Sequence, residues 1–392
     1  MATIQNIPKL RFPRFNEEWE VNKLNKFASI NPKNSSLPES FVYIDLESVT
    51  DGHLIKNNVI SKNEAPSRAQ RILKEKDILY QTVRPYQKNN LYFNKIGDYV
   101  ASTGYAQIRT KNDSQFLFHF LHTEKFVANV MLRCTGTSYP AINSTDLSSI
   151  EISFPTLPEQ QKIASFLCAV DEKIQQLSRK KELLEQYKKG VMQQLFSGKL
   201  RFKDENGEDY ADWKPRKLAD FCTFFSGGTP TSTNQKFYSG TIPFIGSGNI
   251  YDSKVFNFIS QEAYDSSSAK LVEKGDLLYA LYGANSGELA ISKMNGAINQ
   301  AILCIRNSEC IEYLYYVLLL NKDNIVAKYL QGGQGNLSAQ IIKKLKYRFP
   351  SLPEQQKIAN FLTRIDVKIE STNQQIHQMQ SFKKGLLQQL FV

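Results

Sequence analysis

The chain has 392 residues, which is long enough for two or three domains of ordinary size. Its apolar fraction of 41% and aromatic fraction of 11% predict packed globular domains and exclude a disordered chain. The 49 basic and 38 acidic residues leave a net charge of +11, which indicates a polyanionic partner such as nucleic acid or else serves solubility alone.

Membrane, secreted and disulfide-rich proteins are disfavoured by simple features. The longest apolar run, residues 313–320, is far shorter than the roughly 18 residues that a membrane span requires. The N-terminus carries no hydrophobic signal region, so we expect a cytoplasmic protein with no membrane partner. The 5 cysteines never form a C-x-x-C pair, which fits a reducing compartment and predicts neither a zinc site nor a disulfide framework.

The first domain is expected over residues 1–153. KLRF at 9–12 is followed by an acidic stretch and by Trp19, and the runs EKDILY (75–80) and YAQIRT (105–110) predict strands. The loops at 67–71 and 82–90 carry side chains that donate to phosphates and base edges, unless they are simply solvated turns. The candidate DNA-binding residues here are Ser67, Arg68, Arg71, Arg84, Tyr86 and Lys88.

A long spacer helix is predicted over residues 154–198. Pro158 suits a first helical turn, and Glu159 favours the positive end of the helix dipole. From Ile163 to Leu195 the chain steps alternately by four and three residues through 10 positions, of which 8 are apolar. A seam that repeats about every 3.5 residues is typical of a coiled coil, the alternative being a separate surface helix on a globular core.

The second domain is expected over residues 199–348 and follows the same plan as the first. KLRF recurs at 199–202 before an acidic stretch and Trp213, and strands are predicted at 273–279 and 301–307. Three polar, glycine-rich loops, 226–235, 245–249 and 282–287, allow close approach of the backbone to a phosphate chain. The candidate DNA-binding residues here are Thr229, Thr231, Ser232, Ser247, Asn249, Tyr282 and Asn285.

The last segment, 349–392, repeats the first helix and shows that the chain is a tandem duplication. Without gaps, 22 of the 43 positions from 154 to 196 are identical to those 195 residues later, and the two halves carry +6 and +5 charges. The connectivity requires the second helix to run back antiparallel, so that the C-terminal QQLFV ends near KLRF at 9–12. We therefore predict an α+β protein: two mixed α/β domains separated by two long antiparallel coiled-coil helices with pseudo-twofold symmetry.

Motifs for catalysis are missing from the sequence. SGKL at 197–200 lacks the glycine and hydroxyl residues of a P-loop, and His119 and His122 are expected to be ordinary residues of a helix. Asp171 and Asp366 each begin an Asp-x-Lys pattern found in nucleases, but residues two apart on a helix point in different directions. The sequence predicts no catalytic residue, no metal ligand and no cofactor.

The chain resembles the specificity subunits of type I restriction–modification systems. The resemblance rests on the two copies of F-P-x-L-P-E-Q-Q-K-I-A-x-F-L, on the Trp-x-x-x-x-Leu segments (19–24 and 213–218) and on the GGTPTS loop of the second domain. The first domain has NPKNSSLPES in place of GGTPTS, so base contacts should not be transferred between the domains.

This resemblance implies two target-recognition domains that each read half of a bipartite double-stranded DNA sequence, with the helices as a molecular ruler. It implies that catalysis belongs to partners: two methyltransferase subunits and ATP-dependent restriction subunits. Two other classes stay open at this point. A stand-alone enzyme would modify or cut DNA by itself. A coiled-coil scaffold without DNA recognition would keep the helical rod but not the cationic balance, and gel-shift binding that loses its salt dependence would favour it.

Overall fold

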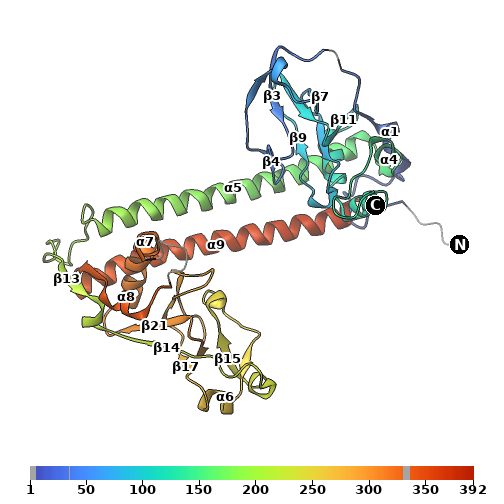
Figure 1. The fold of residues 1–392 in the computed structure, drawn as a ribbon. Helices are drawn as coiled ribbons and strands as arrows, with labels where there is room; N and C mark the ends of the chain where they lie inside the picture. The colour runs from blue at the N-terminus through green and yellow to red at the C-terminus, as the bar shows by residue number, and fades with distance from the viewer. Residues whose placement is uncertain (1–5, 35, 330–335) are drawn as a thin grey trace. The chain divides into compact units, whose positions relative to one another are not determined.

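The structure is a computed structural model that describes residues 6–34, 36–329 and 336–392. The chain divides into two compact units, and each unit is formed by segments from both halves of the sequence. Unit 1 consists of Met1–Arg179 with Asn373–Val392, and unit 2 of Lys180–Thr372. Two long helices, α5 (Leu157–Phe196) and α9 (Leu352–Leu390), each contribute to both units (Figure 1).

Unit 1 combines β-sheets with short helices. Its strands are β1 (Glu20–Lys23), β2 (Ala28–Ile30), β3 (Ser40–Ile44), β4 (Val49–Thr50), β5 (His53–Leu54), β6 (Val59–Ser61), β7 (Ala69–Ile72), β8 (Ile78–Gln81), β9 (Leu91–Tyr92), β10 (Tyr99–Ser102), β11 (Tyr105–Thr110) and β12 (Glu151–Phe154). Its short helices are α1 (Leu24–Phe27), η1 (Lys62–Glu64), η2 (Pro85–Gln87), α2 (Ser114–Phe120), α3 (Glu124–Met131) and α4 (Ser144–Ser148). The strands form two four-stranded sheets, ordered β6-β3-β10-β7 and β2-β11-β8-β9, the two-stranded ribbon β1-β12 and the pair β4-β5.

Unit 2 repeats this arrangement with its own strands. They are β13 (Lys214–Lys217), β14 (Cys222–Ser226), β15 (Ile242–Ile245), β16 (Phe258–Ile259), β17 (Lys270–Val272), β18 (Leu277–Ala280), β19 (Leu289–Ile291), β20 (Gly296–Ile298), β21 (Ile302–Asn307) and β22 (Lys346–Phe349). Besides its parts of α5 and α9, its helices are η3 (Leu218–Asp220), η4 (Gln235–Tyr238), η5 (Ser247–Asn249), α6 (Gln261–Asp265), the longer α7 (Ile311–Tyr329) and α8 (Ala339–Lys344). The sheets are ordered β14-β21-β18-β19 and β16-β15-β20-β17, with the ribbon β13-β22.

The four strands predicted from the sequence are confirmed as β8, β11, β18 and β21, and they form the centres of their sheets. All four residues of β8 and of β18 are buried, because both faces of these strands are covered. In each unit a bidentate ion pair ties the central strands together. Arg109 binds both carboxylate oxygens of Asp77 at 2.7 Å, and Arg306 binds both oxygens of Asp276 at 2.6 Å.

The antiparallel pairing of the long helices is confirmed within each unit. In unit 1 the start of α5 shares a core with the end of α9, where Lys383 Nζ lies 2.6 Å from the carboxylate of Asp171. In unit 2 the end of α5 shares a core with the start of α9, where Lys188 Nζ lies 2.5 Å from Asp366. Every position of the predicted seam on both helices is buried or half-buried. Both aspartates thus lie on helices and pair with lysines, as expected for helix-surface charges.

The chain ends meet as the duplication requires. The N–H of Leu10 donates to the carbonyl of Gln389 at 2.9 Å in unit 1. The equivalent bond in unit 2 joins Leu200 to Gln194 at 3.1 Å, within one continuous segment. The C-terminal tail therefore lies beside KLRF at 9–12, as predicted.

Two further expectations concern single elements. His119 is buried on α2 and His122 lies just beyond the end of that helix, so both are part of a packed helical region. Within the described residues, no helix has the length and apolar character to cross a membrane. Ser35, in the predicted NPKNSSLPES loop, lies outside the described residues.

Candidate nucleic-acid interface

The sheet topology of unit 1 gathers several loops at one edge. Strands β3 and β10 are parallel and end together, with Ala101 opposite Ile44, and β7 starts beside the end of β10. The tight turn at Thr103 and Gly104 leads from β10 into β11, whose first residue lies opposite the last residue of β8. We call this the carboxyl edge of unit 1; it comprises residues 31–34, 45–48, 67–68, 82–90 and 103–104.

Two of the predicted residues of unit 1 lie at this edge just before β7. Ser67 and Arg68 are both exposed, and the carbonyl of Arg68 accepts a hydrogen bond of 2.9 Å from the N–H of Thr103. Arg71, in contrast, lies inside β7, opposite Ala101, and is half-buried. Burial lowers the pKa of Arg71, and its Nε has no acceptor among the described residues. The structure therefore places Arg71 on the sheet, behind the exposed loop.

The other three predicted residues of unit 1 follow β8. Arg84 and Lys88 both have φ of 54°, so they flank the short helix η2 in the left-handed region and turn the chain sharply. The guanidinium of Arg84 lies 4.2 Å from the ring centre of Tyr139, and Tyr86 is 50% exposed. Lys88 Nζ lies 3.0 Å from Glu124, and this hydrogen bond lowers the pKa of the Glu124 carboxyl. This side of the edge thus presents Arg84 beside an aromatic ring and Lys88 paired with a carboxylate.

Unit 2 has a corresponding carboxyl edge, comprising residues 227–235, 246–251, 267–268, 281–287 and 299–301. Strands β15 and β20 are parallel and end together, and β14 and β18 both end where β21 begins. Two glycines hold the 227–235 loop in place. A Cβ on Gly227 would lie 1.7 Å from the carbonyl oxygen of Ile298, and one on Gly228 would lie 1.9 Å from Ser268 Oγ. Only glycine permits this close approach.

The predicted residues of unit 2 lie on neighbouring loops of this edge. The hydroxyl of Thr229 donates to the side-chain oxygen of Gln300, while Thr231 and Ser232 are exposed. Ser247 and Asn249 form the short helix η5. The structure thus brings the 227–232 and 246–249 loops to the same edge.

The third predicted loop of unit 2 contains Tyr282 and Asn285, both half-buried. Burial raises the pKa of the Tyr282 hydroxyl. A tyrosine hydroxyl can donate as well as accept a hydrogen bond. A Cβ on Gly248 would lie 3.7 Å from Asn285 Nδ2, so the 282–287 loop contacts the 246–249 loop. Asn249 itself donates to Asp252 at 2.9 Å.

Sequence reasoning missed several residues of this edge. Asn299 and Gln300 follow β20 and stand among the predicted loops, but the residues between two strands had no distinctive pattern. Phe256 is 97% exposed just before β16, which pairs with the edge-directed strand β15. The sequence did offer one signal for Phe256, because its aromatic ring stands within residues 251–257, most of which are polar.

The two edges differ in chemistry. Unit 1 offers two arginines, two lysines and a tyrosine, whereas unit 2 offers mainly hydroxyls and amides. Arginine pairs with guanine edges and phosphates, and amides pair with adenine, so both sets suit DNA and differ in what they could read. Within the described ranges, no three His, Cys, Asp or Glu side chains are grouped so as to hold a metal ion.

Known proteins resemble this chain over nearly its whole length. A family model described as the type I restriction modification DNA specificity domain matches residues 16–186 and 210–381. The chain is 25% identical to the type I restriction enzyme MjaVIII specificity subunit of Methanocaldococcus jannaschii, over 98% of this chain and 94% of that protein. It is 21% identical to the HindI specificity subunit of Haemophilus influenzae, over 79% of this chain and 84% of that protein.

Solved structures share the fold. The crystal structure of a type I restriction-modification S subunit from M. genitalium has a TM-score of 0.66 at 16% identity and matches 98% of this chain and 99% of that chain. A chain from a structure of type I R-M complex assembly has a TM-score of 0.59 at 21% identity and matches 95% of this chain and 97% of that one.

Proposed function

Because this chain belongs to the type I restriction modification DNA specificity family, we propose that its two units read the two halves of a bipartite double-stranded DNA target. The chain is a DNA-recognition subunit and not an enzyme, as its specificity-subunit relatives indicate. The observation that supports two half-sites is the presence of one carboxyl edge in each unit, built by the same strand topology from different residues.

In unit 1, Arg68 and Arg84 contact DNA from neighbouring loops of the carboxyl edge. A guanidinium donates two parallel hydrogen bonds to guanine or to a phosphate, and each good bidentate base contact discriminates by about 1–3 kcal/mol. Tyr86 and Lys88 flank the two arginines and position the DNA backbone, and Ser67 is a further hydrogen-bond donor. Arg71 supports the loop from within the sheet.

In unit 2, the hydroxyls of Thr229, Thr231, Ser232 and Ser247 and the amides of Asn249 and Asn285 perform the reading, with Tyr282 as a further donor. These neutral groups form hydrogen bonds with base edges but neutralise no phosphates. The half-site read by unit 2 therefore differs in base composition from that read by unit 1.

The domain limits follow from the sequence repeat: recognition domains at 1–153 and 199–348, and spacer helices at 154–198 and 349–392. The helices set the separation of the half-sites and bind the other subunits. Those subunits are two methyltransferases, each acting on an adenine in one half-site, and ATP-dependent restriction subunits. The 5 free cysteines fit an assembly that works in the cytoplasm.

Mapping of modified bases tests the proposal. The full chain is expressed with its methyltransferase partner, and methylated positions are sequenced for wild type, Arg68→Ala with Arg84→Ala, and Thr231→Ala with Asn249→Ala. We expect a bipartite motif whose first half relaxes in the former variant and whose second half relaxes in the latter. Lys293→Ala, an exposed cation outside both edges, serves as the matched control.

A continuous methylated motif, or one in which both variants relax the same half, would refute the two-reader proposal. Gel shifts over a salt series address the scaffold alternative, because phosphate contacts make affinity fall steeply with salt. Purified chain that methylates or cuts DNA alone would instead establish an autonomous enzyme.

A further inference from the structure

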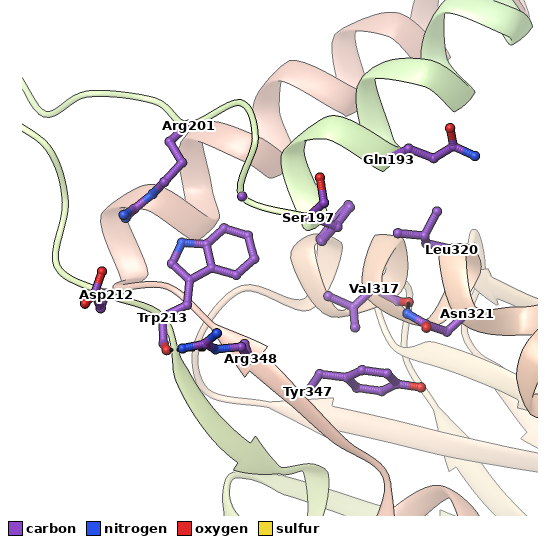
Figure 2. A pocket seen from close by; sticks show the side chains of 12 residues that line it. Gln193, Ser197, Arg201, Asp212, Trp213, Val317, Leu320, Asn321, Tyr347 and Arg348 are labelled. Carbon is purple, nitrogen blue, oxygen red and sulfur yellow. Dashed lines mark hydrogen bonds between the residues drawn. The ribbon is translucent and has the colours of Figure 1, made fainter.

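Unit 2 contains a pocket of about 550 Å³ at the end of α5, and none of the residues that line it belongs to the carboxyl edge. Figure 2 shows Trp213, just before β13, and Arg348, from β22, on one side of this pocket and Val317 and Leu320, from α7, on the other. Trp213 is half-buried, and Arg348 is exposed. The pocket combines apolar walls with a charged rim, which is the usual composition of a binding site.

The same region of unit 1 can be identified from its aromatic contacts. Trp213 meets Tyr313 edge-on at 6.4 Å, and Phe196 lies 5.4 Å from that tyrosine. In unit 1, Trp19 meets Phe116 at 5.9 Å, and Phe391 lies 5.2 Å from that phenylalanine. The two tryptophans therefore occupy equivalent places in the repeat.

In unit 1 this region is covered by the N-terminal segment of the chain. Asn6 accepts from the N–H of Trp19 at 3.4 Å, donates to its carbonyl at 3.0 Å and accepts from Ser153 at 3.1 Å. Pro8 is buried as well, and Trp19 is only 3% exposed. In the repeat Phe120 stands where unit 2 has Val317, and its larger ring contacts Phe391 at 5.7 Å.

In unit 2 the covering segment is missing from the described residues, and one of the two hydrogen bonds that Asn6 forms with the backbone of Trp19 has no counterpart at Trp213. Arg348 stands at the position of Ser153, and its Nε donates to the carbonyl of Trp213 at 3.3 Å, which replaces the amide of Asn6. The N–H of Trp213 has no acceptor within the described part of the chain. An extended segment that enters the pocket would supply the missing carbonyl.

The charge of the neighbouring ribbon indicates what kind of segment fits. Residues 214–217 and 346–349 carry five cations and no acid, whereas the equivalent residues 20–23 and 151–154 carry two glutamates and one lysine. Arg216 is neutralised by Glu309 at 2.7 Å. Lys217, Lys346 and Arg348 are exposed on one face of the ribbon, because Lys217 lies opposite Lys346 in the register.

We propose that this pocket binds an extended, acidic segment of a partner protein that places an apolar side chain between Trp213 and Val317. Its backbone carbonyl accepts from the Trp213 N–H, as Asn6 does in unit 1, and its carboxylates pair with the ribbon cations. Among the described residues this site is open in unit 2, whereas unit 1 covers the equivalent region with residues of its own chain. The proposal rests on the assembly into a multisubunit complex proposed above.

Binding of short synthetic peptides tests this. Overlapping peptides that span the methyltransferase and restriction subunits encoded with this chain are titrated by fluorescence anisotropy into the full-length wild type, Val317→Phe and Arg348→Ser. Val317→Phe fills the pocket with the ring that unit 1 uses, and Arg348→Ser installs the residue of unit 1 at the rim. We expect at least one acidic peptide to bind, with affinity about tenfold lower in each variant. Lys293→Ser, an exposed cation outside the ribbon, should bind like wild type.

Different results of this titration would contradict different parts of the proposal. If no peptide binds, or if Val317→Phe binds as well as wild type while retaining the wild-type melting temperature, the pocket is not a peptide site. If Arg348→Ser weakens DNA binding and lowers its salt dependence without affecting peptides, the ribbon contacts DNA and the proposal is wrong. Failure of the partner subunits to co-purify with wild type would instead contradict the assembly itself.

Discussion

Two equivalent buried ion pairs fasten the KLRF segments to the starts of the long helices, and they should differ in strength. Arg11 donates to both carboxylate oxygens of Glu159 at 2.8 Å, and Glu159 is 1% exposed. Arg201 donates to Glu354 at 3.1 and 2.7 Å, and Glu354 is completely buried. Glu354 also accepts from the indole N–H of Trp213 at 3.2 Å, a bond that Glu159 lacks among the described residues.

Removing one arginine at a time measures this difference. Arg11→Met leaves a buried carboxylate without a donor, and breaking such a pair costs about 3–5 kcal/mol of unfolding free energy. Arg201→Met leaves the Trp213 bond in place, and a hydrogen bond to a charged group is worth about 1.5–3 kcal/mol. We therefore expect Arg201→Met to be the milder substitution by roughly 1.5–3 kcal/mol.

The 2 tryptophans of the chain provide separate probes, since Trp19 lies in unit 1 and Trp213 in unit 2. Arg11→Met is compared with its parent in a Trp213→Phe background, and Arg201→Met in a Trp19→Phe background. Urea unfolding is followed by tryptophan fluorescence in each case. Arg14→Met, an exposed arginine of unit 1, should change the midpoint little.

A double variant, Arg11→Met with Glu159→Met, replaces both charges by apolar groups and should recover most of the lost stability. The ion-pair reasoning is wrong if Arg11→Met is no more destabilising than Arg14→Met, or if the double variant is as unstable as the single one. An equal loss in the two units would show that the Trp213 bond contributes nothing to Glu354.

Leu167 and Leu362 are both completely buried in the helix pairs, so a charge inserted at either position should prevent a stable DNA-specific complex. A DNA-specific complex that still forms with Leu167→Glu and Leu362→Glu would contradict the antiparallel seam. Burial is the largest single influence on Asp276 and raises its pKa, but the hydrogen bonds from Arg306 and from the Glu273 N–H, together with the charge of Arg306, outweigh burial and leave the pKa below its usual value. A lowered carboxyl pKa gives stability that is present above the unfolded value and lost as pH falls. Asp276→Asn should therefore flatten the decline in the urea midpoint of unit 2 between about pH 5 and pH 3. If the decline is unchanged, the acid sensitivity of unit 2 comes from other groups. Phe256→Ala should weaken DNA binding by about 1–3 kcal/mol without changing the melting temperature, if the exposed ring stacks on a base, and unchanged affinity in gel shifts would exclude that contact.

The elements that the sequence predicted well depend on local patterns. The helix seams could be read because a coiled-coil face repeats within each segment, and the central strands because their residues are apolar and bounded by turns. The polar loops that meet at the carboxyl edges were also recognisable from composition. Their gathering at one edge was not, because it depends on which strands are parallel and where each ends.

Whether an individual side chain is exposed, and what it contacts, depends on residues far away in the sequence. Arg71 belongs by composition to an exposed cationic loop, but pairing with Ala101 places it inside a sheet. Lys88 similarly meets Glu124, which is 36 residues away in sequence. Asn299 and Gln300 join the edge of unit 2 because β20 ends beside β15, and no local pattern marks that event.

The duplication itself was determined by the sequence, because two copies of one segment must fold alike and must share a seam. What distinguishes the copies was decided by the tertiary structure. Arg11 and Glu159 are 148 residues apart in sequence, and Arg201 and Glu354 are 153 apart. Each pair nevertheless links a KLRF segment to the start of a long helix. Beside Trp19 the segment that starts at Asn6 covers the indole, while Trp213 borders an open pocket, because the stretch of unit 2 that corresponds to residues 6–8 is the end of α5 and the turn after it.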